Sequence, residues 1–159
     1  KKILTSSHIS LRVVIMYIHS NVIEVLFIGN NSNVNEIIEV FNEFQNKCNL
    51  TIAADIAEII DDINRNYRDR IYPSIIILDL PKEGIKTIKK IKKDKNLKYI
   101  PVIILTTSST EEDVKNYYCN YASAYLTKPD NINEYKKLIR SFANFWFKWP
   151  ELPKFRLNF

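Results

Sequence analysis

Residues 72 to 84 read Tyr-Pro-Ser-Ile-Ile-Ile-Leu-Asp-Leu-Pro-Lys-Glu-Gly, and this stretch decides the fold. Its four apolar residues, Ile75 to Leu78, show no polar alternation, which is typical of a strand buried on both faces of a parallel sheet. Asp79 follows this strand directly. Because the carboxyl ends of the strands line the ligand crevice of an open α/β sheet, Asp79 is a candidate site residue. The alternative is that Asp79 only starts a turn or caps the next helix.

Apolar segments and helical spacings alternate along the rest of the chain. Besides the central strand, we expect strands at residues 22–28, 50–54, 102–105 and 122–126. Helical spacing follows each of them, at 34–44, 56–67, around a lysine-rich segment after Gly84, from Thr110 onward, and at 132–147. Five such alternations predict an α/β fold with right-handed crossovers and a doubly wound, five-stranded parallel sheet.

Length and composition favour a single domain. The 159 residues are 46% hydrophobic and contain only two Gly, so they suit one core and offer no flexible linker. Residues 1–20 form an N-terminal extension of unclear structure, residues 21–147 the domain, and residues 148–159 an aromatic C-terminal extension. No apolar run approaches a membrane span, and Cys48 and Cys119 lack metal-ligand spacing, so we expect a reduced, cytoplasmic protein.

Polar residues stand at the ends of three expected strands: Asp79, Thr106 and Lys128. In a doubly wound sheet such ends converge on one edge, which places a carboxylate beside an ammonium and a hydroxyl group. A carboxylate can attack a phosphoryl group, and cationic and hydroxyl donors can stabilise the phosphoryl oxygens. The order of these residues therefore suggests aspartyl phosphate chemistry. The plainer alternatives are a salt bridge for Lys128 and a strand-end cap for Thr106.

These residues lie in four segments that resemble the response-regulator receiver (CheY-like) family. The segments are Ile-Ile-Leu-Asp-Leu (76–80), Pro-Lys-Glu-Gly (81–84), Ile-Pro-Val-Ile-Ile-Leu-Thr-Thr-Ser-Ser (100–109) and Ala-Tyr-Leu-Thr-Lys-Pro (124–129). The resemblance implies a flavodoxin-like fold with strand order 2-1-3-4-5. The late Phe-Trp-Phe at 145–147 and Leu-Pro at 152–153 also resemble small single-domain regulators of phytochrome-type histidine kinases.

The resemblance assigns a role to each matching residue. It implies that Asp79 is the phosphoacceptor, that Lys128 contacts the phosphoryl group, and that Thr106 supplies the hydroxyl that reorients toward it. Tyr125 matches the aromatic residue whose inward or outward rotamer reports phosphorylation, although ordinary packing would also explain it. The bond between Lys128 and Pro129 matches a bond that is cis in the family, so the resemblance implies cis here. X-Pro bonds are otherwise usually trans.

The chain departs from the family pattern in three places. Gly29-Asn30 replaces the acidic pair that holds Mg²⁺, which leaves Asp79 and the Asn30 side chain as a weak magnesium site at best. Two residues are missing from the loop after Asp79, which normally supplies a metal-binding carbonyl. Tyr121 occupies a position that is commonly Gly, so a positive φ there would strain it.

We therefore expect a response-regulator receiver in two-component phosphorelay signalling, not an enzyme acting on an external substrate. Its partners would be a histidine kinase, with the phytochrome type as one option, and a downstream protein that docks on the receiver. The alternative is a pseudo-receiver that acts as an interaction module without phosphate. Eight lysines between Lys82 and Lys98, against two acids, raise nucleic-acid binding as a third reading, but a solvated helix face explains them better.

The C-terminal segment is rich in aromatic residues: Phe142, Phe145, Trp146, Phe147, Trp149, Phe155 and Phe159. Part of this segment must be covered, either by the domain itself or by a second copy. We favour a homodimer through the last helix and its extension over packing within one chain.

Overall fold

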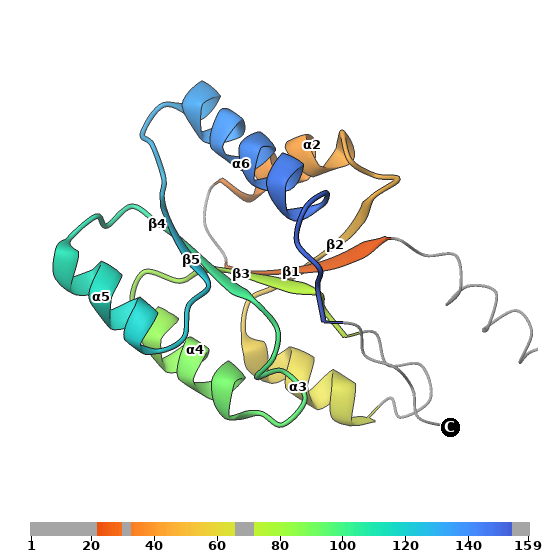
Figure 1. Cartoon of the computed structure of the whole chain (residues 1–159), viewed down its shortest axis with the longest axis vertical. Coiled ribbons are helices and arrows are strands. Elements are labelled where there is room, and N and C mark those ends of the chain that lie inside the picture. The colour runs from red at the N-terminus through yellow and green to blue at the C-terminus, as the bar shows by residue number, and fades with distance from the viewer. Residues whose placement is uncertain (1–21, 30–32, 66–71, 154–159) are drawn as a thin grey trace, which may run out of the picture.

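The computed structural model describes residues 22–29, 33–65 and 72–153, and its strands form one parallel sheet (Figure 1). The expected extension at 1–20 lies outside these residues. The strands are β1 (Ile23–Gly29), β2 (Cys48–Ala53), β3 (Ile75–Asp79), β4 (Val102–Thr106) and β5 (Ala124–Thr127). All neighbours pair in parallel in the order β2-β1-β3-β4-β5, which confirms the expected flavodoxin-like topology.

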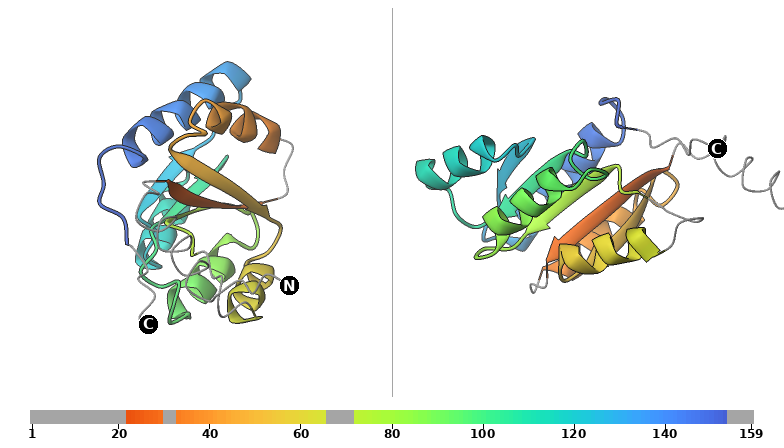
Figure 2. Two further views of the ribbon diagram at one scale, coloured as in Figure 1. Left: turned by 90° about the vertical axis from the view of Figure 1, so that its right-hand side faces the viewer. Right: turned by 90° about the horizontal axis from the view of Figure 1, so that it is seen from below.

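Among the described residues, five helices cover the two faces of this sheet. They are α2 (Val34–Asn42), α3 (Ile56–Arg65), α4 (Gly84–Lys93), α5 (Glu111–Cys119) and α6 (Ile132–Trp146). Helices α2 and α6 lie on one face, whereas α3, α4 and α5 lie side by side on the other (Figures 1 and 2). In the described part of the chain, no helix is both long and apolar enough to cross a membrane.

The central strands are buried on both sides, as the unbroken apolar run of β3 predicts. Every residue of β3 and β4 is buried. Ile76 and Leu78 pack with the residues of α3, α4 and α5, while Ile75 and Ile77 pack with those of α2 and α6. Asp79 is the last residue of β3, so the buried strand delivers its carboxylate to the edge of the sheet.

The structure moves the expected boundaries by a few residues. The last strand begins at Ala124 and not at Ala122, because the Ser123 N–H already donates to the Val102 carbonyl at 2.8 Å from the preceding turn. Helix α2 ends at Asn42, and Phe44 lies in the turn that follows. The Phe44 N–H donates to the Phe41 carbonyl. The predicted end of the second helix at Tyr67 lies outside the described residues.

Helix α5 ends with a left-handed residue, as the departure at Tyr121 suggested. Tyr121 has φ of 67° and is the one described residue other than Gly with positive φ. The Tyr121 N–H donates to the Tyr118 carbonyl and the Ala122 N–H to the Tyr117 carbonyl, which satisfies the end of the helix. A β-carbon costs free energy in this conformation, so Tyr121 is strained.

Most of the described C-terminal aromatic residues pack within the chain. The Phe147 ring lies 5.5 Å from that of Phe41 and 5.7 Å from that of Phe44, between centroids. Phe145 and Trp149 remain 53% and 68% exposed. Intramolecular packing thus accounts for one part of the segment, and an exposed aromatic surface for another. Phe155 and Phe159 lie outside the described residues.

Candidate functional site

Asp79 and Lys128 form a buried ion pair at the carboxyl edge of the sheet. The Lys128 Nζ lies 2.9 Å from Oδ1 and 2.9 Å from Oδ2 of Asp79. The Asp79 side chain is fully buried, and only 8% of the Lys128 side chain is exposed. Lys128 follows directly after β5, so the pair joins the ends of two strands with β4 between them. Sequence order alone predicted this contact.

Thr106 lies at the same edge, as the last residue of β4. It is buried, and its backbone carbonyl accepts a hydrogen bond of 2.7 Å from the Lys128 N–H. Its hydroxyl oxygen accepts a hydrogen bond from the Ser108 N–H at 3.3 Å. The three strand-end residues therefore share one rim. The structure joins Thr106 to Lys128 through the backbone and leaves the role of its hydroxyl as a prediction.

Tyr125 connects this rim to the loop between β4 and α5. Its hydroxyl donates to the Ser108 carbonyl at 3.0 Å, and its ring lies 5.6 Å from the Tyr117 ring. Burial raises the pKa of Tyr125 above its usual value, so the hydroxyl stays protonated and remains a donor. Because Ser108 also contacts the Thr106 hydroxyl, Tyr125 and Thr106 meet at one loop residue.

The same loop is fixed by a carboxylate at the start of α5. The Thr110 hydroxyl donates to Asp113 Oδ2 at 2.8 Å, and the Ser108 hydroxyl donates to the same oxygen. These two hydrogen bonds, with that of Ser108 the stronger influence, hold the pKa of Asp113 below its usual value. Thr110 in turn accepts from the Asp113 N–H and caps the helix. The sequence indicated the acidic first turn but not this network.

Gly29 stands beside Asp79 where the family has an acid. It ends β1 and pairs with Asp79 in the sheet. A β-carbon at this position would lie 2.8 Å from the Asp79 backbone oxygen, closer than real β-carbons approach. Asn30, the other expected metal ligand, lies outside the described residues. Within the described part of the chain, no three acidic, His or Cys side chains are grouped to hold a metal ion.

One expectation from the family resemblance is wrong. Among the described residues no peptide bond is cis, so the bond between Lys128 and Pro129 is trans. The trans form is the intrinsic preference of X-Pro bonds.

Two buried oxygen atoms near the site were not foreseen. The hydroxyl of Tyr135 in α6 and the Oε2 atom of Glu36 in α2 are buried, and neither has a hydrogen-bond partner in the described structure. Burial, then the charges of Asp79 and Glu36, raise the pKa of Tyr135. The sequence placed residue 135 in the last helix, but no local pattern indicates which charges its hydroxyl approaches.

A second contact missed by the sequence joins α4 to α5. A β-carbon at Gly84, the first residue of α4, would lie 2.0 Å from the Tyr117 hydroxyl oxygen. Tyr117 therefore occupies space that only a glycine leaves open. Because Tyr117 also contacts Tyr125, the start of α4 is linked through two rings to the rim that carries Asp79.

A comparison with protein-family models agrees with this geometry. The model described as the response regulator receiver domain matches residues 25–140. The chain belongs to this family. Receiver domains are signalling modules of two-component systems that interact with histidine kinases and downstream proteins, and the receiver fold is the one that the sheet topology shows.

Curated relatives of this receiver domain include two response regulators. Response regulator Rcp1 of Synechocystis sp. is 37% identical over 90 residues, which cover 55% of this chain and 61% of Rcp1. The probable methanogenesis regulatory protein FilR2 of Methanothrix harundinacea is 33% identical over 87 residues, covering 53% of this chain and 56% of FilR2. The matches thus span less than two thirds of either relative.

Solved receiver structures superpose on most of the chain. Response regulator RPA3017 in red light signaling of R. palustris has a TM-score of 0.70 at 29% identity and covers 84% of this chain and 99% of its own. The Mn²⁺-bound form of Rcp1 has a TM-score of 0.72 at 29% identity, and the match covers 82% of this chain and 99% of the Rcp1 chain. The phosphorylated cyanobacterial phytochrome response regulator RcpA has a TM-score of 0.73 at 26% identity, and the match covers 82% of this chain and 98% of the RcpA chain.

Proposed function

We propose that this receiver domain accepts a phosphoryl group on Asp79 and then alters a surface on which a partner protein docks. The observation that carries the proposal is the buried pair of Asp79 and Lys128, whose ammonium lies 2.9 Å from both carboxylate oxygens. A fixed cation at this place can stabilise the charge that develops on a transferred phosphoryl group.

The transfer step follows from this geometry. One Asp79 oxygen attacks phosphorus, the bond from phosphorus to the donor's imidazole nitrogen breaks, and the imidazole keeps that electron pair. Lys128 gives up its hydrogen bond to the attacking oxygen and donates to a phosphoryl oxygen. The Thr106 hydroxyl, at the end of the adjacent strand, turns toward the phosphoryl group as a second donor.

The switch would act through the loop between β4 and α5. When the Thr106 hydroxyl turns to the phosphoryl group, it gives up its hydrogen bond from the Ser108 N–H. Ser108 also accepts from Tyr125, so a change at Thr106 is passed to that ring. The added negative charge supplies the bias for this rearrangement.

The described residues do not fit a strong magnesium site. Mg²⁺ prefers oxygen ligands that include one or two free carboxylates. Here Gly29 offers no side chain, and both oxygens of Asp79 already accept from Lys128. We therefore expect weak magnesium binding, with Asn30 as the remaining side-chain ligand besides Asp79.

The same observations favour a second candidate, a pseudo-receiver that works without phosphate. In that case Lys128 neutralises Asp79 permanently and the domain acts as an interaction module. Replacement of the acidic pair by Gly29 and Asn30 agrees with this candidate, whereas retention of Asp79, Thr106 and Lys128 agrees with the first.

Incubation with acetyl phosphate, with and without millimolar Mg²⁺, separates the two candidates. The first predicts a protein whose intact mass increases by one phosphoryl group, with no increase in the Asp79→Asn variant. Beryllofluoride should also change the fluorescence of Trp146 or Trp149 in the unmodified protein alone. An unchanged mass and unchanged fluorescence in folded protein would leave only the pseudo-receiver.

The proposal includes its partners and location. We expect the phosphate donor to be a histidine kinase of phytochrome type, because similar regulators act in phytochrome signalling. We expect the protein itself to be cytoplasmic. We also expect a homodimer through α6 and its extension, because Phe145 and Trp149 are exposed there. Light scattering on the protein and on a Phe145→Ala/Trp149→Ala variant tests the dimer, which the variant should lose. A monomeric unmodified protein at high concentration would contradict it.

A further inference from the structure

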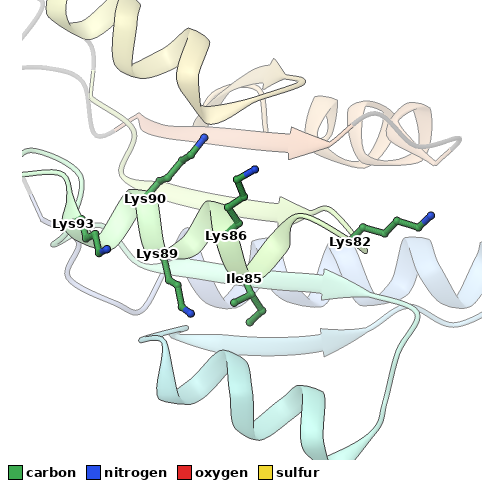
Figure 3. A pocket seen from close by; sticks show the side chains of 6 residues that line it. All are labelled: Lys82, Ile85, Lys86, Lys89, Lys90 and Lys93. Carbon is green, nitrogen blue, oxygen red and sulfur yellow. The ribbon is translucent and has the colours of Figure 1, made fainter.

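Helix α4 presents a row of lysines to solvent. Lys82, just ahead of the helix, and four lysines within it line a shallow, open hollow together with Ile85 (Figure 3). The side chains are Lys82, Ile85, Lys86, Lys89, Lys90 and Lys93. Within the helix, the positions 86, 89 and 93 are separated by three and four residues, the spacing that keeps side chains on one side of a helix.

Most of these charges have no ion-pair partner in the part of the chain that the structure describes. Lys86 pairs with Glu83 at 3.3 Å in an exposed contact, whereas Lys82, Lys89, Lys90 and Lys93 form no ion pair with any described residue. Lys92 differs, because its Nζ donates to the Lys98 and Ile100 carbonyls at 3.2 and 2.8 Å. Lys92 thus stabilises the fold, while Lys82, Lys89, Lys90 and Lys93 are exposed to solvent.

Acidic helices flank this row on both sides. Helix α4 lies between α3 and α5 on the same face of the sheet (Figure 1). On α3, Glu58 is exposed, and on α5, Glu112 is exposed while exposed Glu111 pairs with Lys115 at 2.8 Å. The positive surface is therefore a strip about one helix wide, bordered by negative charge.

We propose that α4 docks an acidic segment of a partner protein, whose carboxylates lie along the lysines and whose apolar side chain contacts Ile85. This inference deepens the proposed function, because it names a docking surface of the receiver and the chemistry of its partner. Charge complementarity along the strip provides the attraction, and the acids of α3 and α5 fix the segment's position on it.

The width of the strip favours a peptide segment over other polyanions. A nucleic-acid duplex or an anionic membrane extends well beyond one helix and would bring its phosphates against the exposed acids of α3 and α5. The hollow also contains no Arg for bidentate phosphate contacts and no aromatic residue for base stacking. A polypeptide supplies both carboxylates and an apolar side chain, which matches lysines around Ile85.

The probe is a labelled peptide of about 12 residues, which as a helix spans about 18 Å, with Glu at every third or fourth position and one central Leu. Fluorescence anisotropy measures its binding to unphosphorylated protein at about 50 and 300 mM salt. We expect binding at low salt and weaker binding at high salt. A single-stranded oligonucleotide and phosphatidylserine vesicles are tested in parallel.

Matched charge reversals locate the site. Lys89→Glu/Lys90→Glu should weaken peptide binding about tenfold, because two attractions are replaced by repulsions. Lys137→Glu/Lys148→Glu changes the net charge equally, on and just after α6 at the other face of the sheet, and should weaken binding less than about twofold. Circular dichroism confirms that both variants fold. Ile85→Ser should also weaken binding without changing its salt dependence.

Three outcomes would overturn the proposal: no peptide binding, equal weakening by both double variants, or preferential binding of the oligonucleotide or the vesicles. Because the assay uses unphosphorylated protein, a failure to phosphorylate Asp79 does not affect it.

Discussion

Replacement of Lys128 by Met should strongly destabilise the domain, because it leaves the Asp79 carboxylate buried without its cation. Asp79 is fully buried and both of its oxygens accept from Lys128 at 2.9 Å. Removing one partner of a buried ion pair costs about 3–5 kcal/mol. For a domain of this size, that corresponds to a fall in the melting temperature of roughly 6–20 °C.

Urea unfolding followed by circular dichroism measures this loss. Lys115→Met, which breaks an ion pair with Glu111 whose side chains are 71% and 81% exposed, is the matched control and should cost under about 1 kcal/mol. Adding Asp79→Leu to Lys128→Met should recover most of the stability, because no buried charge remains. A loss for Lys128→Met no larger than that for Lys115→Met would refute the reasoning.

Three further predictions concern residues away from this pair. Tyr121→Gly should raise the free energy of unfolding by about 0.5–1 kcal/mol in thermal melts, because φ of 67° suits Gly, and a decrease would contradict the strain. Gly84→Ala should cost about 1–3 kcal/mol through overlap with the Tyr117 hydroxyl, and Tyr117→Phe should restore most of it; equal losses in both backgrounds would exclude this contact. Burial, then the charge of Glu24, raises the pKa of Cys48 to about 11, so a thiol reagent at pH 8 should modify exposed Cys119 first and Cys48 only on unfolding.

The fold was predictable because its signals are local. The unbroken apolar run of Ile75 to Leu78 predicted a strand buried on both faces, and the structure buries all of β3. Parallel strands end at one edge, so the order of Asp79, Thr106 and Lys128 predicted their common rim. Glycine is common at the position of Tyr121, which is why a positive φ was considered there, and the structure has a φ of 67° at this residue.

The remaining features depend on contacts between residues far apart in the chain. The sequence predicted the last helix, which contains Tyr135, but did not show that Asp79 and Glu36 lie near its hydroxyl. Likewise, nothing near Gly84 in the sequence indicates that Tyr117 will occupy the space above it. The expectation of a cis bond before Pro129 was wrong. It rested on the family resemblance alone, against the intrinsic preference of X-Pro bonds for trans.

The close approach at Gly29 limits which side chains this position accepts. An aspartate introduced at this position would push its own β-carbon to 2.8 Å from the backbone oxygen of Asp79, the residue it is meant to assist. A single substitution would therefore shift Asp79 while adding charge beside it. A side chain fits at this position only if the ends of β1 and β3 first move apart.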